Sequence, residues 1–391
     1  MLPGAEVVVI GGGIIGVSVA YHLAKRGVDV ALVEKGDIAS GTSSHCMANL
    51  QLSTKTIGPK LDLAVESIKL HHGLEEELGA DLEFKEEGGM IVAQTEDEVE
   101  FVASRVAQYQ HAGIEMEYLD AKECRLRQPV LADHVMGSLY SPRDSQVNPM
   151  YLSMAFVRQA KRLGAKMYPF TLVTGIRVQD AAITSVATVK GKIATRTVVN
   201  AAGPWAPSIA KMVGLDLPIT PRRGQILVTE PAPPLFDGLI LSADYLLSKK
   251  MPGEGKDAHS RMLSGVVTNQ VHRGNCLIGS TRSFSGFDIG NSYKGIQALV
   301  RNSVRLIPMF GELHIIRSYA GLRPATPDGL PIMERTPELP SLITASGHEG
   351  DAIALGPMTG KLIAQLIAQK TGEEALSPFT SRRFHTDRRQ Q

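Results

Sequence analysis

Residues 7–34 read VVVIGGGIIGVSVAYHLAKRGVDVALVE, and this stretch decides the fold of the chain. It opens on a short β-branched run, which is typical of a buried parallel strand. Gly11, Gly13 and Gly16 follow in G-x-G-x-x-G spacing, and an apolar helical pattern begins among them. Glycines at this spacing let the backbone turn and approach a pyrophosphate, whose charge the helix N-terminus stabilises. The stretch therefore predicts a dinucleotide-binding strand, turn and helix.

A second strand and an acidic residue complete the pattern. Gly27 stands where the helix is expected to end, residues 29–33 form a second apolar run, and Glu34 follows it. An acid here accepts the hydroxyls of an adenosine ribose and favours FAD or NAD over NADP, because it would repel a 2′-phosphate. The alternative is that Glu34 is a solvated strand end. The predicted dinucleotide contacts in this unit are Gly11, Gly13, Ile14, Ile15, Gly16, Glu34 and Lys35.

The composition fits a cytosolic enzyme. The chain has 391 residues, of which 43% are hydrophobic, so it can bury a sizeable core and is expected to form two domains. Its formal net charge of +1 gives no electrostatic reason to expect nucleic acid or an anionic membrane as partner. The three cysteines, Cys46, Cys124 and Cys276, are far apart. Their spacing argues against a disulfide framework, a zinc site or an iron–sulfur cluster held by this chain alone.

The apolar residues 7–20 do not read as a signal peptide, because no basic region precedes them and their glycines suit a strand and turn. No other run approaches the roughly 20 apolar residues that span a bilayer. We therefore expect a cytoplasmic protein without an integral membrane segment, one that a partner could still hold at the inner membrane.

Residues 35–50 are rich in Gly, Ser and Thr and lack helix or strand periodicity. Hydroxyls in such a loop can bond phosphate or ribitol oxygens, and the alternative is a solvated linker. Together with the glycine fingerprint, the sequence EKGDIASGTSS resembles the FAD-dependent D-amino-acid oxidase superfamily. His45 falls close to where some relatives attach FAD covalently, and a partly exposed loop histidine is the alternative. The resemblance implies that the loop wraps the flavin through Ser40, Gly41, Thr42, Ser43 and Ser44.

Two later segments match the family in the expected order. Residues 198–203 read VVNAAG, an element that packs against the flavin in the family. Residues 321–331 read GLRPATPDGLP, in which Arg323 matches an arginine that fixes the substrate carboxylate in some family members. The alternative for Arg323 is a structural ion pair with Asp328. The cofactor contacts implied in this part of the chain are Val173, Ala201, Ala202, Gly203, Trp205 and Arg323.

A third segment, residues 346–353, reads SGHEGDAI and enters a helix. Backbone donors at such a helix start can stabilise an electron-rich reduced flavin. The family's GHxG pattern is present, but the arginine that some glycine-oxidase relatives carry just after the histidine is absent, which weakens the inference that simple glycine is the substrate. The implied contacts are Gly347, His348, Glu349, Gly350, Asp351, Ala352 and Ile353.

The resemblance covers nearly the whole chain and implies an α/β fold of two domains. A Rossmann-like FAD-binding domain is expected from residues 1–85, 145–220 and 325–380. A second, α+β substrate-binding domain, built on a mostly antiparallel sheet, is expected from residues 86–144 and 221–324.

Local patterns predict the secondary structure. Helices are expected at residues 61–78, 95–113 and 293–307. Strands are expected at residues 246–248, 261–268 and 275–280, with a loop at residues 253–260.

Polar residues near two of these helices have structural interpretations. Asn148 is expected to cap a helix that begins at Pro149, a role preferred here to any catalytic role for Asp144. His71 and His72 are adjacent, so they lie on different helix faces and are interpreted as surface residues rather than a metal pair.

The functional prediction is a flavoenzyme that removes a hydride from the α-carbon of a secondary amine, imino acid or D-amino acid. The loop and the final turn most resemble the β subunits of bacterial D-hydroxyproline, proline and opine dehydrogenases and of hydrogen cyanide synthase, whose partner subunits carry further flavin or iron–sulfur centres. Arg323 is the candidate for holding a carboxylate, with Tyr245 and His348 as further candidates in the pocket. The alternatives are a self-sufficient oxidase that uses oxygen, a non-catalytic FAD relay subunit and a nicotinamide enzyme.

Overall fold

The computed structural model describes residues 2–250, 263–369 and 372–384. Its first sheet has six strands in the order β19-β20-β13-β1-β2-β9, and all of them except β19 run parallel. The strands are β1 Val7–Ile10, β2 Val30–Val33, β9 Lys166–Tyr168, β13 Thr197–Asn200, β19 Ile332–Arg335 and β20 Leu342–Ser346. The predicted strand, glycine turn, helix and strand are therefore confirmed around β1.

Alternating side chains of β1 enter two different cores, which explains the layers on either side of this sheet. Val7 and Val9 pack into the core that α1 shares, whereas Val8 and Ile10 pack toward a small antiparallel sheet. Helix α1 contacts both α5 and α9, and α9 also contacts α2. The helices are α1 Ile14–Ala24, α2 Pro59–Leu78, α5 Pro149–Arg162 and α9 Ala352–Ala368, and the small sheet is β10 Val173–Gln179, β11 Ala182–Thr188 and β12 Gly191–Ala194.

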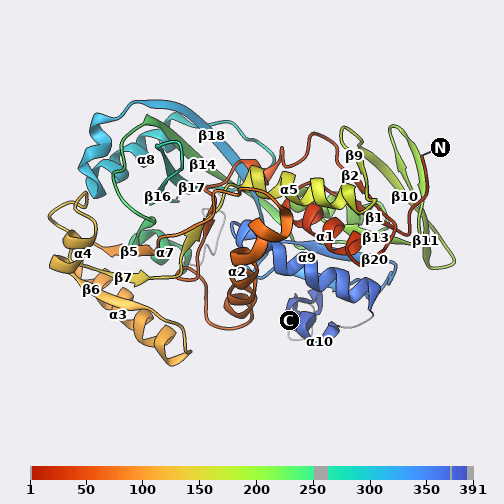
Figure 1. Ribbon diagram of the computed structural model, residues 1–391, viewed down its shortest axis with the longest axis horizontal. Coiled ribbons are helices and arrows are strands. Elements are labelled where there is room, and N and C mark those ends of the chain that lie inside the picture. The colour runs from red at the N-terminus through yellow and green to blue at the C-terminus, as the bar shows by residue number, and fades with distance from the viewer. Residues whose placement is uncertain (1, 251–262, 370–371, 385–391) are drawn as a thin grey trace, which may run out of the picture.

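The second large sheet has eight strands in the order β18-β14-β17-β16-β15-β5-β7-β6. Its neighbouring strands are antiparallel except for β15 and β5. The strands are β5 Gly89–Ala93, β6 Glu117–Asp120, β7 Gly137–Ser141, β14 Thr220–Pro231, β15 Leu239–Ser242, β16 Leu263–Gln270, β17 Asn275–Arg282 and β18 Ile315–Ala325. This mixture of a mainly parallel and a mainly antiparallel sheet confirms the predicted fold class. Figure 1 shows the two sheets at opposite ends of an elongated molecule, with α2 between them.

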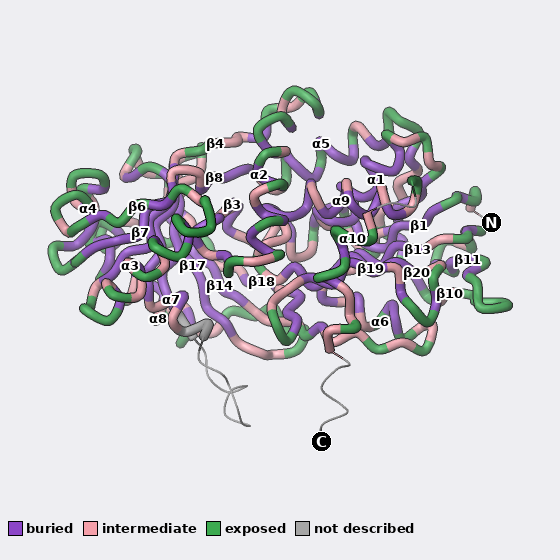
Figure 2. The backbone as a smooth tube through the Cα atoms, turned by 90° about the horizontal axis from the view of Figure 1, so that it is seen from below, coloured by how far each residue is buried: buried purple, intermediate pink, exposed green. Residues whose placement is uncertain are grey.

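Helices cover both faces of the second sheet. Val102 of α3 and Leu246 of α7 pack on the face that continues into the core of α1, whereas Leu299 of α8 and Cys124 of α4 pack on the other face. In Figure 2 the strands of both large sheets are mainly buried and exposure concentrates in the outer loops. These helices are α3 Glu96–His111, α4 Ala121–Arg127, α7 Ala243–Lys250 and α8 Tyr293–Leu306.

Shorter elements connect the two sheets and finish the chain. A three-stranded sheet, in the order β3-β8-β4, follows the cofactor loop. The remaining elements are β3 Asn49–Leu50, β4 Lys85–Glu86, β8 Ser145–Gln146, α6 Ala206–Lys211, α10 Glu373–Leu376 and the 3₁₀ turns η1 Thr42–Ser44, η2 Gly203–Trp205, η3 Pro308–Glu312, η4 Ser377–Phe379 and η5 Ser381–Phe384.

Most of the predicted elements are present. The helices predicted at residues 61–78, 95–113 and 293–307 are confirmed as α2, α3 and α8. The Asn148 side chain accepts hydrogen bonds from the amides of Met150 and Tyr151, which confirms the predicted cap of α5. The strands predicted at residues 261–268 and 275–280 correspond to β16 and β17 over the described residues. The loop predicted at residues 253–260 lies outside them.

Two local predictions are wrong. Residues 246–248 belong to helix α7 rather than to a strand, because a run of three residues cannot distinguish period 2 from period 3.6. His71 is buried and only His72 is exposed, since His71 lies on the face of α2 that packs against α9. There the His71 Nε2 donates to the carbonyl of Ile353 at 3.2 Å.

Candidate functional site

A cavity of about 470 Å³ lies where the carboxyl end of the parallel sheet meets the antiparallel sheet. The glycine turn after β1, the loop after β2 and the end of β13 supply one side of it. Strands β14, β17 and β18 and the turn before α9 supply the other side. Ligands of open α/β sheets bind at the carboxyl ends of parallel strands, so the position suits a cofactor site.

Most residues predicted to contact the cofactor line this cavity. Gly16, Ser44 and Gly347 are the exceptions among them, since none of the three is part of the cavity wall. The predicted residues that do line the wall are Gly11, Gly13, Ile14, Ile15, Glu34, Lys35, Ser40, Gly41, Thr42, Ser43, Val173, Ala201, Ala202, Gly203, Trp205, Tyr245, Arg323, His348, Glu349, Gly350, Asp351, Ala352 and Ile353.

The glycine turn is packed so closely that side chains are excluded from it. Gly11 has φ of +115°, and a Cβ there would lie 2.4 Å from the Ala201 carbonyl oxygen. A Cβ on Gly16 would lie 1.9 Å from the Gly11 carbonyl oxygen, so Gly16 has a packing role behind the wall. The turn therefore leaves its backbone uncovered on the cavity side, as a bound pyrophosphate requires.

Glu34 is held in place by the backbone of the same turn. Its carboxylate accepts hydrogen bonds from the amides of Gly12 at 2.7 Å and Gly36 at 2.8 Å. Each carboxylate oxygen keeps further lone pairs, and the residue lines the cavity. This geometry fits an acid that accepts ribose hydroxyls.

The hydroxyls of the loop after β2 bond protein atoms in this structure. Thr42 donates to the Leu322 carbonyl at 2.6 Å, and Ser43 accepts from the Ile14 amide at 3.0 Å. Ser44 donates to the Gly41 carbonyl at 3.1 Å, and the His45 Nδ1 lies 2.8 Å from the same oxygen. The loop is thus a folded turn that spans both sheets rather than a solvated linker.

Sequence reasoning missed the continuation of this loop. Asn49 and Gln51 line the cavity, and the Asn49 Oδ1 and Gln51 Nε2 atoms are buried without a partner among the described residues. Buried polar atoms normally have hydrogen-bond partners, so these two are suited to a polar ligand such as a flavin ring edge. With the uncovered glycine turn and Glu34, they make the cavity fit FAD.

A buried carboxylate fixes the same loop from behind. Asp144 accepts hydrogen bonds from the Leu52 amide at 2.8 Å, from the amide and hydroxyl of Ser53, and from the Ser141 hydroxyl at 2.9 Å. The Tyr109 hydroxyl donates to the Ser53 carbonyl at 2.9 Å. Asp144 therefore has a structural role, distinct from the cap supplied by Asn148.

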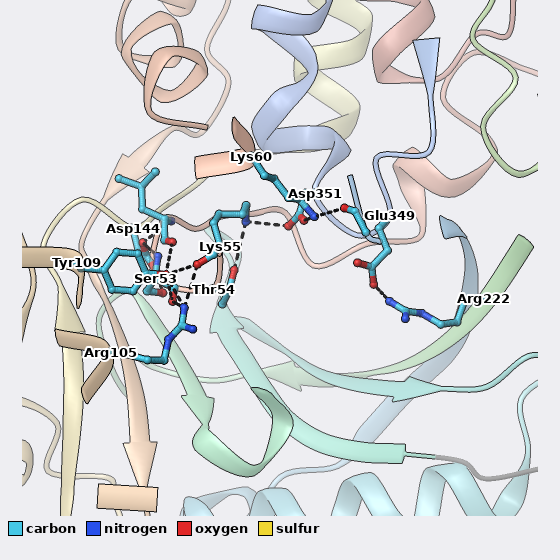
Figure 3. A network of polar contacts seen from close by, with 12 residues as sticks. Ser53, Thr54, Lys55, Lys60, Arg105, Tyr109, Asp144, Arg222, Glu349 and Asp351 are labelled. Carbon is cyan, nitrogen blue, oxygen red and sulfur yellow. Dashed lines mark hydrogen bonds and ion pairs between the residues drawn. The ribbon is translucent and has the colours of Figure 1, made fainter. Parts of the chain in front are cut away.

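Beyond Ser53, Lys55 of the loop and Lys60 at the start of α2 reach the turn before α9 (Figure 3). Lys55 and Lys60 lie 2.8 Å and 2.6 Å from the carboxylate oxygens of Asp351. Both lysine side chains are largely buried, with 2% and 10% exposure. The same turn carries Glu349, which forms an ion pair with Arg222. The acids of the GHEGD segment are thus already neutralised by cations from distant parts of the chain.

His348 is buried beneath this turn, and its Nε2 lies 3.0 Å from the Thr359 hydroxyl of α9. Burial, reinforced by the charge of Lys60, lowers the pKa of His348 to about 3. The imidazole is therefore neutral at physiological pH and braces the turn against α9.

Arg323 lies on the cavity wall, held by β17. Its Nη2 donates to the Ser280 hydroxyl at 2.7 Å and its Nη1 to the Thr281 carbonyl at 3.2 Å. The alternative ion pair with Asp328 is not formed, because Asp328 bonds Arg383 at 2.6 Å. No ion pair joins Arg323 to an acidic side chain within the described residues.

Tyr245 and Arg282 continue the wall beyond Ser280. The Tyr245 hydroxyl lies 3.3 Å from the Ser280 hydroxyl, and the Arg282 guanidinium lies 3.9 Å from the Tyr245 ring centroid. Sequence reasoning missed Arg282. The alternation of β17 places Ser280 and Arg282 on the same face, and this pattern could have identified Arg282 if the predicted strand, residues 275–280, had extended two residues further.

Two further observations concern metal ions and membranes. Among the described residues, His, Cys, Asp and Glu side chains nowhere gather in a group of three or more that could hold a metal ion. Within those same residues, no helix is both long and apolar enough to cross a membrane.

Comparison with known proteins identifies the class. A family model described as FAD dependent oxidoreductase (DAO) matches residues 6–366. The chain therefore belongs to this family of FAD-dependent oxidoreductases, and FAD is its cofactor.

Among individual proteins, the chain is 30% identical to the hydrogen cyanide synthase subunit HcnC of Pseudomonas aeruginosa, over 98% of this chain and 97% of that protein. It is 32% identical to glycine oxidase of Geobacillus kaustophilus, over 96% of each chain. The crystal structure of L-proline dehydrogenase from P. horikoshii superposes with a TM-score of 0.89 at 26% identity and covers 99% of both chains.

Proposed function

We propose that this chain oxidises a secondary amine, imino acid or D-amino acid of the D-hydroxyproline, proline or opine type. In this proposal it acts as the β subunit of a multi-subunit dehydrogenase. The six-stranded sheet belongs to the FAD-binding domain, over residues 1–85, 145–220 and 325–380, and the eight-stranded sheet to the substrate-binding domain, over residues 86–144 and 221–324. The relatives named hydrogen cyanide synthase subunit, glycine oxidase and L-proline dehydrogenase support this class of substrate.

The observation that carries the proposal is that Arg323 lines the cavity without forming an ion pair to a described acidic side chain. Its guanidinium lines the cavity and is oriented by the Ser280 hydroxyl and the Thr281 carbonyl, without a described acidic partner. A planar guanidinium held in this way suits a bidentate pair with a substrate carboxylate. Tyr245, beside Ser280, is proposed to line the same subsite.

The cationic wall also favours the reactive form of an amine. Arg323 and Arg282 line the cavity, and positive charges close to an amine lower its pKa because they disfavour the ammonium ion. The chain therefore holds the carboxylate, which orients the α-carbon, and promotes loss of the amine proton. When bound, FAD supplies the two-electron acceptor for the hydride from that carbon.

His348 is proposed to position rather than to transfer protons. It is buried, neutral and bonded to Thr359. The next residue, Glu349, forms an ion pair with Arg222. Some glycine-oxidase relatives have arginine at the position of Glu349. This difference supports a substrate other than simple glycine.

Anaerobic titration of the FAD-loaded protein with imino and amino acids tests the proposal through loss of the flavin absorbance. Bleaching by proline, D-hydroxyproline or an opine is the expected result. Slow recovery in air supports a dehydrogenase that needs partner subunits, whereas fast recovery identifies a stand-alone oxidase. Bound FAD that no amine reduces, either alone or with candidate partner subunits, would replace the proposal with an electron-relay role.

A further inference from the structure

The cavity has an excess of positive charge at its substrate end. Three acidic side chains line it among the described residues, namely Glu34, Glu349 and Asp351. Glu34 bonds the backbone of the glycine turn, and the other two pair with Arg222 and with the two lysines. The three acids of the wall therefore all bond other groups, and no ion pair joins Arg282 or Arg323 to a described acid, although the charge of Asp351 acts on Arg282 from a greater distance.

Arg282 is buried, with 5% of its surface exposed to solvent. Its Nη1 donates to the Tyr245 carbonyl at 3.1 Å and its guanidinium packs on the Tyr245 ring. The Nε atom is buried and has no hydrogen-bond partner within the described residues. A buried guanidinium is costly unless an anion compensates it, and the Tyr245 contacts satisfy only part of its donor set.

The sheet register places these guanidiniums on one wall. Ser280, which holds Arg323, and Arg282 are two residues apart on β17, so their side chains share a face. Arg323 stands on β18, and β14 lies between the two strands. The Arg323 guanidinium crosses β14 to bond Ser280 and Thr281 of β17, the strand that carries Arg282, so the two guanidiniums border one small-molecule subsite on the same wall of the cavity.

We propose that the substrate carries two carboxylates, one bound by Arg323 and the second by Arg282, as in an N-(carboxyalkyl) amino acid. The inference rests on the proposed function for the first carboxylate and for the amine between the two. A dianion places a carboxylate at each guanidinium, whereas a monocarboxylate leaves the buried Arg282 without a bound carboxylate. Arg282 is then the residue that determines specificity for the second acid group.

Binding of unreactive ligands to the FAD-loaded protein tests the proposal without turnover. Diglycolate carries two carboxylates around an ether oxygen, and methoxyacetate is its monocarboxylate counterpart. We expect diglycolate to perturb the flavin spectrum with a Kd at least about tenfold lower, and Arg282→Met to abolish this preference through a loss of roughly 10- to 100-fold for diglycolate alone. Arg317→Met, an exposed arginine on β18, is the matched control and should leave both Kd values unchanged.

Equal affinity of the wild-type protein for the two ligands would overturn the proposal, as would an equal loss of both in Arg282→Met. If that variant fails to fold, Arg282→Gln, which keeps hydrogen-bond donors but removes the charge, takes its place, and an unchanged preference in it overturns the assignment of Arg282. Reduction of the flavin by N-carboxymethylalanine and by N-methylalanine distinguishes failure of the second-carboxylate proposal from failure of the proposed amine oxidation. If both amines reduce the flavin equally well, only the second-carboxylate proposal fails. If neither does while diglycolate is preferred, the amine oxidation fails and the anion subsite stands.

Discussion

The guanidinium of Arg323 lies against Gly224 on the adjacent strand, where a Cβ would stand 2.2 Å from Nη1. The two residues are close to each other in the sheet register, since Arg222 pairs with Arg323 and Gly224 with Gly321. Arg222 and Arg323 are directly opposite, an arrangement that costs stability between like charges. Burial together with the charges of Arg323 and Arg282 lowers the pKa of Arg222 to about 9, and Glu349 compensates it.

Gly224→Ala should displace the Arg323 guanidinium, because a Cβ cannot share its volume. We expect the Kd of carboxylate ligands to rise about tenfold or more through loss of a charged hydrogen bond, with FAD content unchanged. Spectral titration with methoxyacetate measures the change. Gly175→Ala on β10 is the control, since a Cβ there meets no atom within 4 Å. An unaltered Kd in Gly224→Ala would show that Arg323 does not bind the carboxylate.

At the scale of elements, the segment after β3 is positioned by residues of the antiparallel sheet region and of helix α3. Leu52 and Ser53 bond Asp144, which lies between β7 and β8. Arg105 and Tyr109 of α3 bond the carbonyls of Ser53 and Lys55. The antiparallel sheet and its helix thus position the lysine that pairs with Asp351 at the start of α9.

Asp144→Ala should leave the amides of Leu52 and Ser53 without an acceptor inside the protein. Two buried unsatisfied amides cost about 2–5 kcal/mol in the free energy of unfolding. Urea unfolding measures this loss, and affinity for FAD should fall with it because the loop lines the cavity. Asp133→Ala, at an exposed position, is the matched control. Similar stabilities of the two variants would contradict the role given to Asp144.

At the scale of the whole molecule, the cofactor cavity is also the junction of the two sheets. Residues from both sheets and from the loops between them form its wall. A ligand that binds only this folded arrangement stabilises it by mass action. The stability of the protein is therefore coupled to the occupancy of one site.

Removal of FAD should lower the melting temperature. With free FAD at 100 times its Kd, the folded state gains about 2.7 kcal/mol, so the midpoint should rise with FAD concentration. Thermal unfolding of deflavinated protein across an FAD series measures the effect, and AMP provides a ligand that lacks the flavin ring. A midpoint that does not respond to FAD would contradict a binding site at the junction of the sheets.

Three buried histidines make stability depend on pH. Burial lowers the pKa of His22 and His71 to about 4 and that of His348 to about 3, against 6.5 unfolded. Between these pKa values the unfolded state binds more protons than the folded state. The contribution of the three neutral histidines to the free energy of unfolding is therefore fully present above pH 6.5, and it falls as the pH drops toward 4. Each histidine contributes a slope of up to about 1.4 kcal/mol per pH unit.

The adjacent pair in α2 gives a matched test of this dependence. His71→Gln should flatten the fall in stability between pH 6.5 and 4, because it removes a buried group that the unfolded chain protonates. His72→Gln, on the exposed face and 3.0 Å from the Glu86 carboxylate, is the comparison variant, since it removes a histidine that is not buried. Urea unfolding at several pH values gives both slopes, and identical slopes in the two variants would contradict a buried neutral His71.

Prediction from sequence succeeded where the partners are close along the chain. The unit of β1, α1 and β2 depends on glycines, an apolar period and an acid within residues 7–34, and each of these acts on its immediate neighbours. The Asn148 cap was equally local. The burial of His71 was not predictable, because the side of α2 that faces inward depends on where α9 packs.

The sequence by itself determined the dinucleotide-binding unit, the mixed fold class and the family, because their signatures are short-range patterns of glycine, charge and apolar spacing. Only the tertiary structure decided which charges meet. Asp351 pairs with Lys55 and Lys60 from a distant segment, and Arg323 approaches Ser280 across an intervening strand. These contacts depend on sheet register and helix packing, which a linear pattern does not specify.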